Sequence, residues 1–198
     1  MRANMLIDSL PETVMVDGRE FSIRSDFRTG ILFELLIADN ELSQSQKLSQ
    51  MLMLYYDNVV PANTEEAVNQ ILDFYSCGKR KSPRTGKKGK KQGISSPVYS
   101  FEHDDGLIFS AFLDQYGVDL NEIEYLHWWK FRAMFNALKS DNEISKIMSY
   151  RATDLSTIKD KNERNRIARL KAIHAIPTNM TVEEKVAAAG ALFGGNLK

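Results

Sequence analysis

The segment "NEIEYLHWWKFRAMFNAL", residues 121–138, bears most directly on the fold of this chain because it concentrates aromatic residues. It contains both tryptophans, two phenylalanines, a tyrosine and one of the three histidines. A helix over 121–138 would be apolar on nearly every side, which is typical of a buried helix or of one that docks partners on two sides. We predict that it is the central helix of a helical core, packed on helices near 102–116 and 141–150.

The two tryptophans of this segment cannot both face one surface of a helix. Trp128, Phe131 and Phe135 would form one stripe of the helix, whereas Trp129 would point about 100° away from Trp128. Core packing is therefore the favoured interpretation of these aromatic residues, and a groove for a partner protein is the alternative. His127, beside Trp128, is expected to be a hydrogen-bonded core histidine.

Helix-start signals recur along the rest of the chain. An N-cap residue followed three positions later by Glu or Gln satisfies backbone donors that a helix start leaves unpaired. Six such pairs occur: Ser43 with Gln46, Asn63 with Glu66, Asp119 with Glu122, Ser140 with Glu143, Asp160 with Glu163, and Thr181 with Glu184. Together with the apolar patterning, they predict helices near residues 26–38, 44–57, 64–76, 102–116, 121–138, 141–150, 161–175 and 182–193.

The segment before these helices has the pattern of a β-hairpin. "TVMVDGREFSIRSDF" alternates apolar and polar residues around Asp17-Gly18, a dipeptide suited to a tight turn in which both central residues have positive φ. It predicts strands near residues 12–16 and 19–24. The predicted fold class is therefore mostly α (α+β), with an N-terminal β-hairpin followed by two helical groups joined by a basic flexible linker.

The predicted linker covers residues 78–97 and is rich in Gly, Ser, Pro and like charge, a composition typical of disorder. It separates an N-terminal part with the hairpin and helices, residues 1–77, from a C-terminal helical region, residues 98–177. Residues 178–198 are expected to form a peripheral helix and tail. The sequence leaves open whether the two main parts share one core.

The linker contains eight positive charges within residues 79–91 and no acidic residue. The basic residues are Lys79, Arg80, Lys81, Arg84, Lys87, Lys88, Lys90 and Lys91. They could contact phosphates or an acidic partner through salt-dependent electrostatics. The segment has no aromatic residue to stack on bases, so a plain solubilising linker is the favoured interpretation and nucleic-acid binding is the alternative.

Little in the sequence points to catalysis or metal binding. "EHDD", residues 102–105, superficially resembles the His-Asp pair of metal-dependent phosphohydrolases, but no histidine precedes His103. The acids fit better in the first turn of a helix, at the positive end of its dipole. Cys77 is the only cysteine and lacks a Cys–His signature. We therefore expect no enzymatic activity, no catalytic residue, no cofactor and no bound metal.

The composition also predicts where the protein works. No apolar run approaches the roughly 20 residues that span a bilayer, and the N-terminal segment lacks the apolar core of a signal peptide. A single cysteine suits a reducing compartment. We expect a cytoplasmic protein without a membrane partner.

The N-terminal part of the chain contains "LPETVMVDGREFSIRSDFR", and four further motifs occur later: "YSFEHD" (99–104), "QYGVDL" (115–120), "YLHWWKF" (125–131) and "YRATDLS" (150–156). These motifs resemble the phage gp fifteen family, tail-module proteins of siphophages and prophages of Gram-positive bacteria, and the N-terminal one is similar to the opening of that family. The resemblance spans about residues 5–175. The family contributes no established enzymatic activity.

The resemblance implies a non-enzymatic virion-assembly factor in the host bacterial cytoplasm. Genes of the family typically lie between those of the major tail protein and the tape-measure protein, where tail assembly chaperones are encoded. The expected partners are therefore the tape-measure protein and, beyond it, the tail-tube protein, with self-association favoured by repeated coating of a long chain. Another structural tail component remains an alternative, as does a nucleic-acid-binding module.

A chaperone for a long helical chain needs apolar grooves that accept anchor side chains at helical spacing. Methionine and aromatic residues suit such grooves because they adapt to varied helices. The candidate partner-binding residues are Met51, Met53, Trp128, Trp129 and Met134. Core packing is the favoured alternative at each of them.

Overall fold

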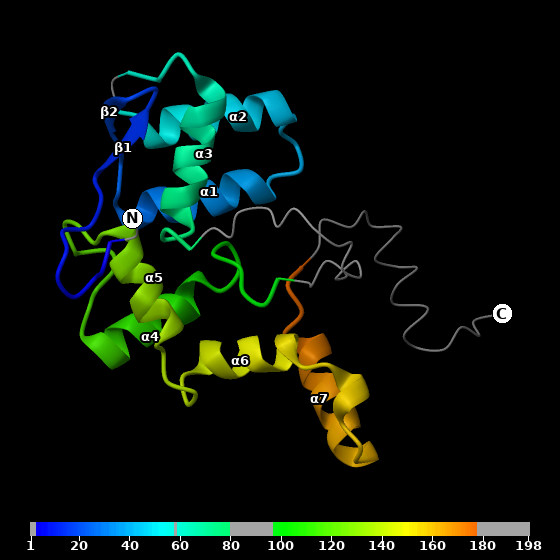
Figure 1. Cartoon of the computed structure of the whole chain (residues 1–198). Coiled ribbons are helices and arrows are strands. Elements are labelled where there is room, and N and C mark those ends of the chain that lie inside the picture. Colours follow the sequence, from blue (N-terminus) through cyan, green and yellow to red (C-terminus); the bar gives the residue numbers. More distant parts are fainter. Residues whose placement is uncertain (1–2, 58, 80–96, 178–198) are drawn as a thin grey trace.

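The computed structural model describes residues 3–57, 59–79 and 97–177. In this part of the chain, α-helices follow a two-stranded antiparallel sheet (Figure 1). The predicted fold class, mostly α with an N-terminal β-hairpin, is confirmed. The predicted linker lies outside the described residues except for Gly78, Lys79 and Pro97, and so does the predicted helix over 182–193 with its cap at Thr181.

The hairpin consists of β1 (Thr13–Val16) and β2 (Arg19–Ser22), which pair antiparallel. Asp17 and Gly18 both have positive φ, 50° and 72°, as the predicted tight turn requires. The backbone N–H of Asp17 also donates a hydrogen bond to Glu66 Oε2 at 2.9 Å. This bond fastens the turn to a helix that follows much later in the chain.

Three helices make up the first helical group: α1 (Phe27–Ala38), α2 (Gln44–Tyr55) and α3 (Thr64–Tyr75). Two predicted caps are confirmed here. Ser43 forms a capping box with Gln46 at the start of α2, and Asn63 accepts a hydrogen bond from the Glu66 backbone N–H at the start of α3.

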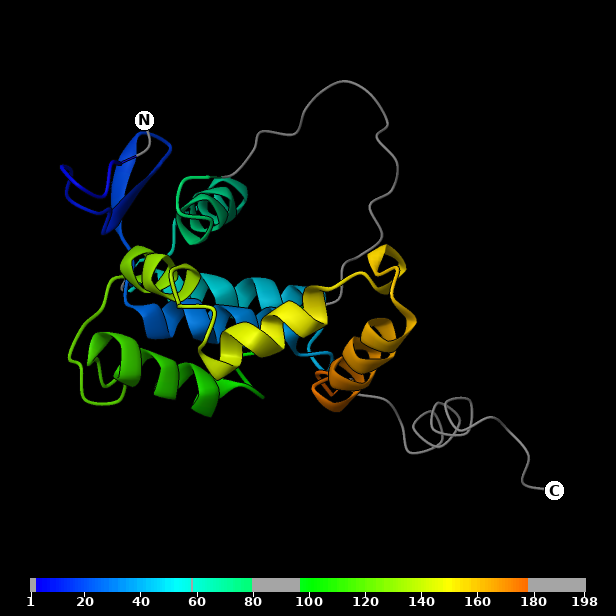
Figure 2. The same ribbon diagram turned by 90° about the horizontal axis from the view of Figure 1, so that it is seen from below.

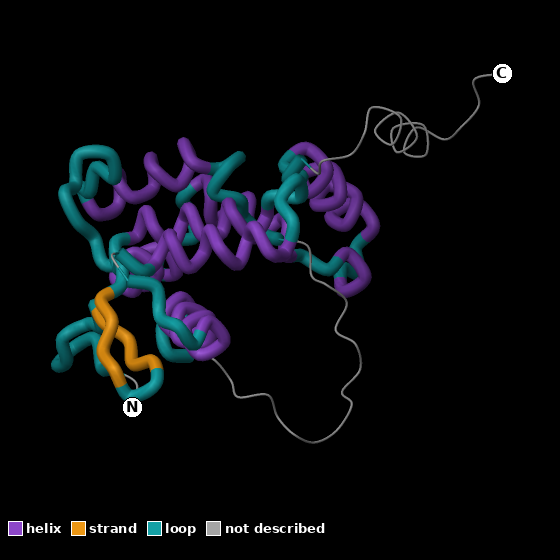
Figure 3. The backbone as a smooth tube through the Cα atoms, turned by 90° about the horizontal axis from the view of Figure 1, so that it is seen from above, coloured by secondary structure: helices purple, strands orange, loops and turns teal. Residues whose placement is uncertain are grey.

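The second group contains α4 (Asp105–Tyr116), α5 (Trp128–Asn136), α6 (Glu143–Ala152), the short 3₁₀ helix η1 (Leu155–Thr157) and α7 (Lys161–Ile173). The cap predicted at Asp160 is confirmed, because its carboxylate accepts from the Glu163 N–H at 2.7 Å. The cap predicted at Ser140 is wrong, because Asn142 takes the N-cap position of α6. Figure 3 shows the hairpin and α7 at opposite ends of the molecule.

The predicted helix over 121–138 is much shorter in the structure, because α5 begins only at Trp128. Asp119 caps a turn instead of a helix: its Oδ1 accepts from the backbone N–H groups of Asn121 and Glu122 at 2.8 and 3.2 Å. Ile123 and Leu126 therefore lie in the connecting loop, outside the helix.

This loop is extended because it pairs with the segment that starts α1. Leu126 O accepts from Phe27 N–H at 2.8 Å, and Ser25 O accepts from Trp128 N–H at 2.7 Å. The Asp26 carboxylate, which caps α1, also accepts from Leu126 N–H at 3.1 Å. The starts of α1 and α5 are thus hydrogen-bonded to each other across about a hundred residues of sequence.

A single hydrophobic cluster contains residues from before and after the basic segment. Phe131 of α5 lies at its centre, fully buried, with its ring stacked on Phe27 at 5.1 Å and on Phe112 at 4.9 Å. The aromatic segment therefore packs on α4, as predicted, and also on α1, which the sequence did not predict. In Figure 2, α1 (blue) and α4 (green) run in roughly the same direction.

Of the acids of "EHDD", Asp105 lies in the first turn of a helix as predicted, whereas Glu102 and Asp104 do not. The helix α4 begins at Asp105, so Asp104 lies at its N-cap position and Glu102 lies before it. Asp104 is buried and forms a bidentate ion pair with Arg151 of α6, with distances of 2.6 and 3.0 Å. The helix start is thereby tied to α6 by a charge pair instead of serving only the helix dipole.

Candidate protein-binding site

The two tryptophans of α5 lie in the core, with exposures of 0% for Trp128 and 5% for Trp129. Each indole N–H donates to a carbonyl at the end of α3: Trp128 to Tyr75 O at 2.9 Å, and Trp129 to Phe74 O at 2.7 Å. In this structure the pair holds the two parts of the chain together, and a contact of either residue with a partner stays a prediction.

The three candidate methionines are not brought together on one helix. Met51 is buried in the core, and Met134 on α5 is half-buried. Met53 on α2 is 67% exposed, so it is the candidate with the most accessible side chain. Among the basic residues, Lys79 is exposed, whereas the other seven, from Arg80 to Lys91, lie outside the described residues.

His127 caps α5. Its Nδ1 accepts from the Trp129 backbone N–H at 3.0 Å, so Nε2 carries the proton and donates to Pro11 O at 3.0 Å. Burial lowers the pKa of this imidazole from its ordinary value of 6.5. Both ring nitrogens are used in structural hydrogen bonds, which gives His127 the role of a core histidine that the sequence predicted.

A polar cluster lies among α1, α3, α5 and the segment before α4, with the side chains of Arg132 and Glu34 25% and 22% exposed. Glu34 Oε1 accepts hydrogen bonds from the hydroxyls of Tyr75 at 2.6 Å and Tyr99 at 3.1 Å. Arg132 contacts the same carboxylate oxygen at 3.3 Å and donates to the Tyr99 hydroxyl at 2.7 Å. Burial, reinforced by Glu34, raises the pKa of Tyr75 and of Tyr99. The cluster joins residues on both sides of the basic segment.

Within residues 3–57, 59–79 and 97–177, no group of three or more His, Cys, Asp or Glu side chains is arranged to hold a metal ion. None of the helices in these ranges combines the length and the apolar character needed to cross a bilayer.

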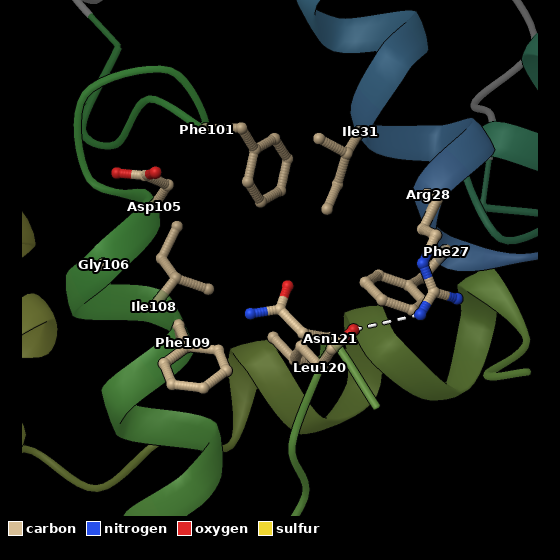
Figure 4. Close-up of a pocket in the computed structure, with 10 residues that line it drawn as sticks. All are labelled: Phe27, Arg28, Ile31, Phe101, Asp105, Gly106, Ile108, Phe109, Leu120 and Asn121. Atoms are coloured by element: carbon tan, nitrogen blue, oxygen red, sulfur yellow. Dashed lines mark hydrogen bonds between the residues drawn. The ribbon is translucent and has the colours of Figure 1, made fainter. Parts of the chain in front are cut away.

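An apolar cleft lies between α1 and α4. It has a volume of about 450 Å³, and the loop before α5 closes one side. Its walls comprise Phe27, Arg28, Ile31, Phe101, Asp105, Gly106, Ile108, Phe109, Leu120 and Asn121. Figure 4 shows apolar side chains from α1, from α4 and from the loop around the same space. We call this site the α1/α4 cleft.

Arg28 is the one cationic residue on the cleft wall, and its guanidinium is held in place. It donates to the carbonyls of Leu120 at 3.0 Å and Ile123 at 2.7 Å, and it contacts Asp26 at 3.3 Å. These bonds fix the loop that forms one wall. The cleft is therefore preformed, with walls suited to an apolar side chain and charge at its rim.

Sequence reasoning missed the cleft and its residues. One signal was present: Gly106 interrupts the apolar helix near 102–116, and a Cβ added there would meet nothing within 4 Å. A glycine inside an apolar helix indicates open space or a close approach. The sequence does not show which of these applies to Gly106. The answer depends on the position of α1, which comes from a distant part of the chain.

Comparison with protein-family models gives a match. The family model described as Bacteriophage Gp15 protein matches residues 6–176. Neither the curated proteins nor the solved structures gave a significant match. The matched range covers most of the chain and nearly all of the described residues, and it agrees with the family expected from the sequence motifs.

Proposed function

This chain belongs to the bacteriophage Gp15 family, and we propose that it is a non-enzymatic assembly factor, a tail assembly chaperone that binds the phage tape-measure protein. Membership of the family supports a structural or assembly role in a phage. Two further arguments support the role of a tail assembly chaperone. The resemblance implies that the family belongs among tail proteins, and the α1/α4 cleft could accept a client.

The cleft is the observation that carries the proposal. A chaperone of this kind accepts apolar anchors from a helical client before the client is enclosed by its final partners. The α1/α4 cleft offers aliphatic and aromatic walls from Ile31, Ile108 and Phe109, and the half-buried and exposed residues at its mouth leave it open. An apolar side chain of the tape-measure protein would be removed from water there, which favours binding and prevents aggregation of the client.

Co-expression with the cognate tape-measure protein tests this role. We expect the full chain to keep the tape-measure protein soluble and to co-purify with it. Gly106→Leu narrows the cleft at an exposed helical position and should reduce co-purification. Ile173→Ser, which changes an apolar residue 66% exposed on α7, is the matched control and should have no effect. An insoluble tape-measure protein beside abundant folded chain would contradict the proposal.

A further inference from the structure

The N-terminal turn, residues 4–8, carries the most exposed large apolar side chains of the described structure. Leu6 is 91% exposed and Ile7 is 81% exposed. The turn that presents them is ordered by its own hydrogen bonds: Asp8 N–H donates to Asn4 O at 2.8 Å, and Asn4 N–H donates to Asp8 Oδ2 at 2.7 Å. The two side chains therefore project from a defined turn into solvent.

Such a projection is costly for a protein that acts alone, because adjacent apolar side chains exposed to water promote association. Their exposure also shows that Leu6 and Ile7 do not fill the α1/α4 cleft of their own copy. In Figure 2 the N-terminal segment lies beside the hairpin, whereas α4 lies on the other side of α1. One chain thus offers both an apolar projection and an apolar receptor, separately placed.

We propose that the N-terminal turn of a second copy of this chain occupies the α1/α4 cleft, with Leu6 and Ile7 as its anchors. The inference rests on the proposed role of the cleft in binding proteins, but not on the identity of the client. A projection and a receptor on different parts of one surface are what a contact between two copies needs.

The chemistry of the two surfaces is complementary. The aliphatic pair meets walls formed by Ile31, Ile108 and Phe109, and about 450 Å³ is within the range of clefts that enclose a small ligand. At the rim, the described structure shows no hydrogen bond from the Asn121 side-chain amide, which is free to bond to the backbone of an incoming turn.

Charge bears on the orientation of this occupant. Asp8 immediately follows the two anchors, and the cleft wall carries Arg28, which also contacts Asp26, and Asp105, so Asp8 is favoured on the Arg28 side and disfavoured beside Asp105. Opposite charges at the edge of an apolar contact favour one orientation of the partner and speed its encounter. A second copy and a client anchor would need the same cleft, so the N-terminal turn keeps the cleft covered until a client displaces it.

Analytical ultracentrifugation of the full chain without any client tests the inference. We expect reversible, concentration-dependent association. The double substitution Leu6→Asp, Ile7→Asp should weaken the association constant by at least about tenfold, because it removes the buried apolar area of both anchors. Both positions are exposed, so folding should be unaffected, and Ile173→Ser is the matched surface control.

The receptor side is tested with Gly106→Leu, and with Asn121→Lys at the exposed rim if the leucine variant does not fold. Each should weaken association as the anchor variant does. Mixing the anchor variant with the cleft variant should restore a heterodimer, because one intact turn then meets one intact cleft. Monomeric wild-type chain at all concentrations, unchanged association of either variant, or no heterodimer in the mixture would overturn the inference. None of these results depends on tape-measure binding, so the two proposals fail separately.

Discussion

Gly30 of α1 lies directly against the indole ring of Trp128 at the start of α5. A Cβ added to Gly30 would overlap with three atoms of that ring. The absence of a side chain therefore allows the two helices to approach closely at the point where their N-termini are also hydrogen-bonded. The contact joins a residue before the basic segment to one after it.

Gly30→Ala is expected to destabilise the protein by about 1–3 kcal/mol, because overpacking at a buried helix contact forces neighbouring groups to move. This loss should exceed the gain of up to about 1 kcal/mol that alanine brings to a helix. Gly106→Ala is the matched control: its Cβ meets open space, so it should be neutral or stabilising. Urea denaturation measures both, and equal stability of the two variants would contradict this packing.

The stability of the protein should depend on His127 below neutral pH. Burial lowers the pKa of the folded imidazole below 6.5, so the unfolded chain binds the proton more readily. The contribution of His127 is thus fully present above pH 6.5 and is lost as the pH falls from 6.5 through the lower folded pKa. Protonation would also remove the Nδ1 acceptor that caps α5.

Denaturation at several pH values between 7 and 4 checks this dependence. His127→Asn keeps a side-chain acceptor suited to an N-cap but does not titrate. We expect its free energy of unfolding to fall less steeply in that range than that of the wild type. The same slope in both proteins would show that other groups account for acid destabilisation.

Arg151 should be required for the attachment of α6 and α7. It pairs with Asp104 at side-chain exposures of 9% and 4%, and it also donates to the carbonyls of Val98 and His174. Arg151→Met leaves a buried carboxylate unpaired and should cost about 3–5 kcal/mol. Arg151→Lys should retain only part of this stability, because an ammonium group cannot reproduce the bidentate geometry.

Hydrogen exchange measured by mass spectrometry would locate the effect of Arg151→Met. We expect faster exchange in α6 and α7, with less change in α1 and α3. Uniform loss of protection along the chain would argue against a local attachment.

Tyr55, which is buried, and Tyr75, which is partly buried, should respond differently to removal of the hydroxyl. Tyr75→Phe removes the 2.6 Å hydrogen bond to Glu34 and should destabilise the protein by about 1 kcal/mol or more. The Tyr55 hydroxyl is buried and has no hydrogen-bond partner in the described structure. Tyr55→Phe should therefore be neutral or stabilising, and thermal denaturation of both variants decides the matter. Equal destabilisation by the two changes would disprove this assignment of partners.

Local sequence determined much of the architecture. Asp17-Gly18 specified a turn that needs positive φ, and Ser43, Asn63 and Asp160 marked helix starts that hold in the structure. The turn and the helix caps depend on residues within a few positions of one another, so they can be predicted from the sequence alone. The burial of the aromatic segment followed from its composition for the same reason.

Tertiary contacts decided where α5 begins and where the apolar α1/α4 cleft forms. The Asp26 carboxylate that accepts from Leu126 is 100 residues away in sequence, and this pairing holds residues near 126 extended although their pattern suits a helix. The cleft likewise needs side chains of α1 and α4 around the same space, with Arg28 holding the loop that closes it. Sequence periodicity records which side chains prefer to be buried, but which distant surfaces meet depends on how the whole core packs.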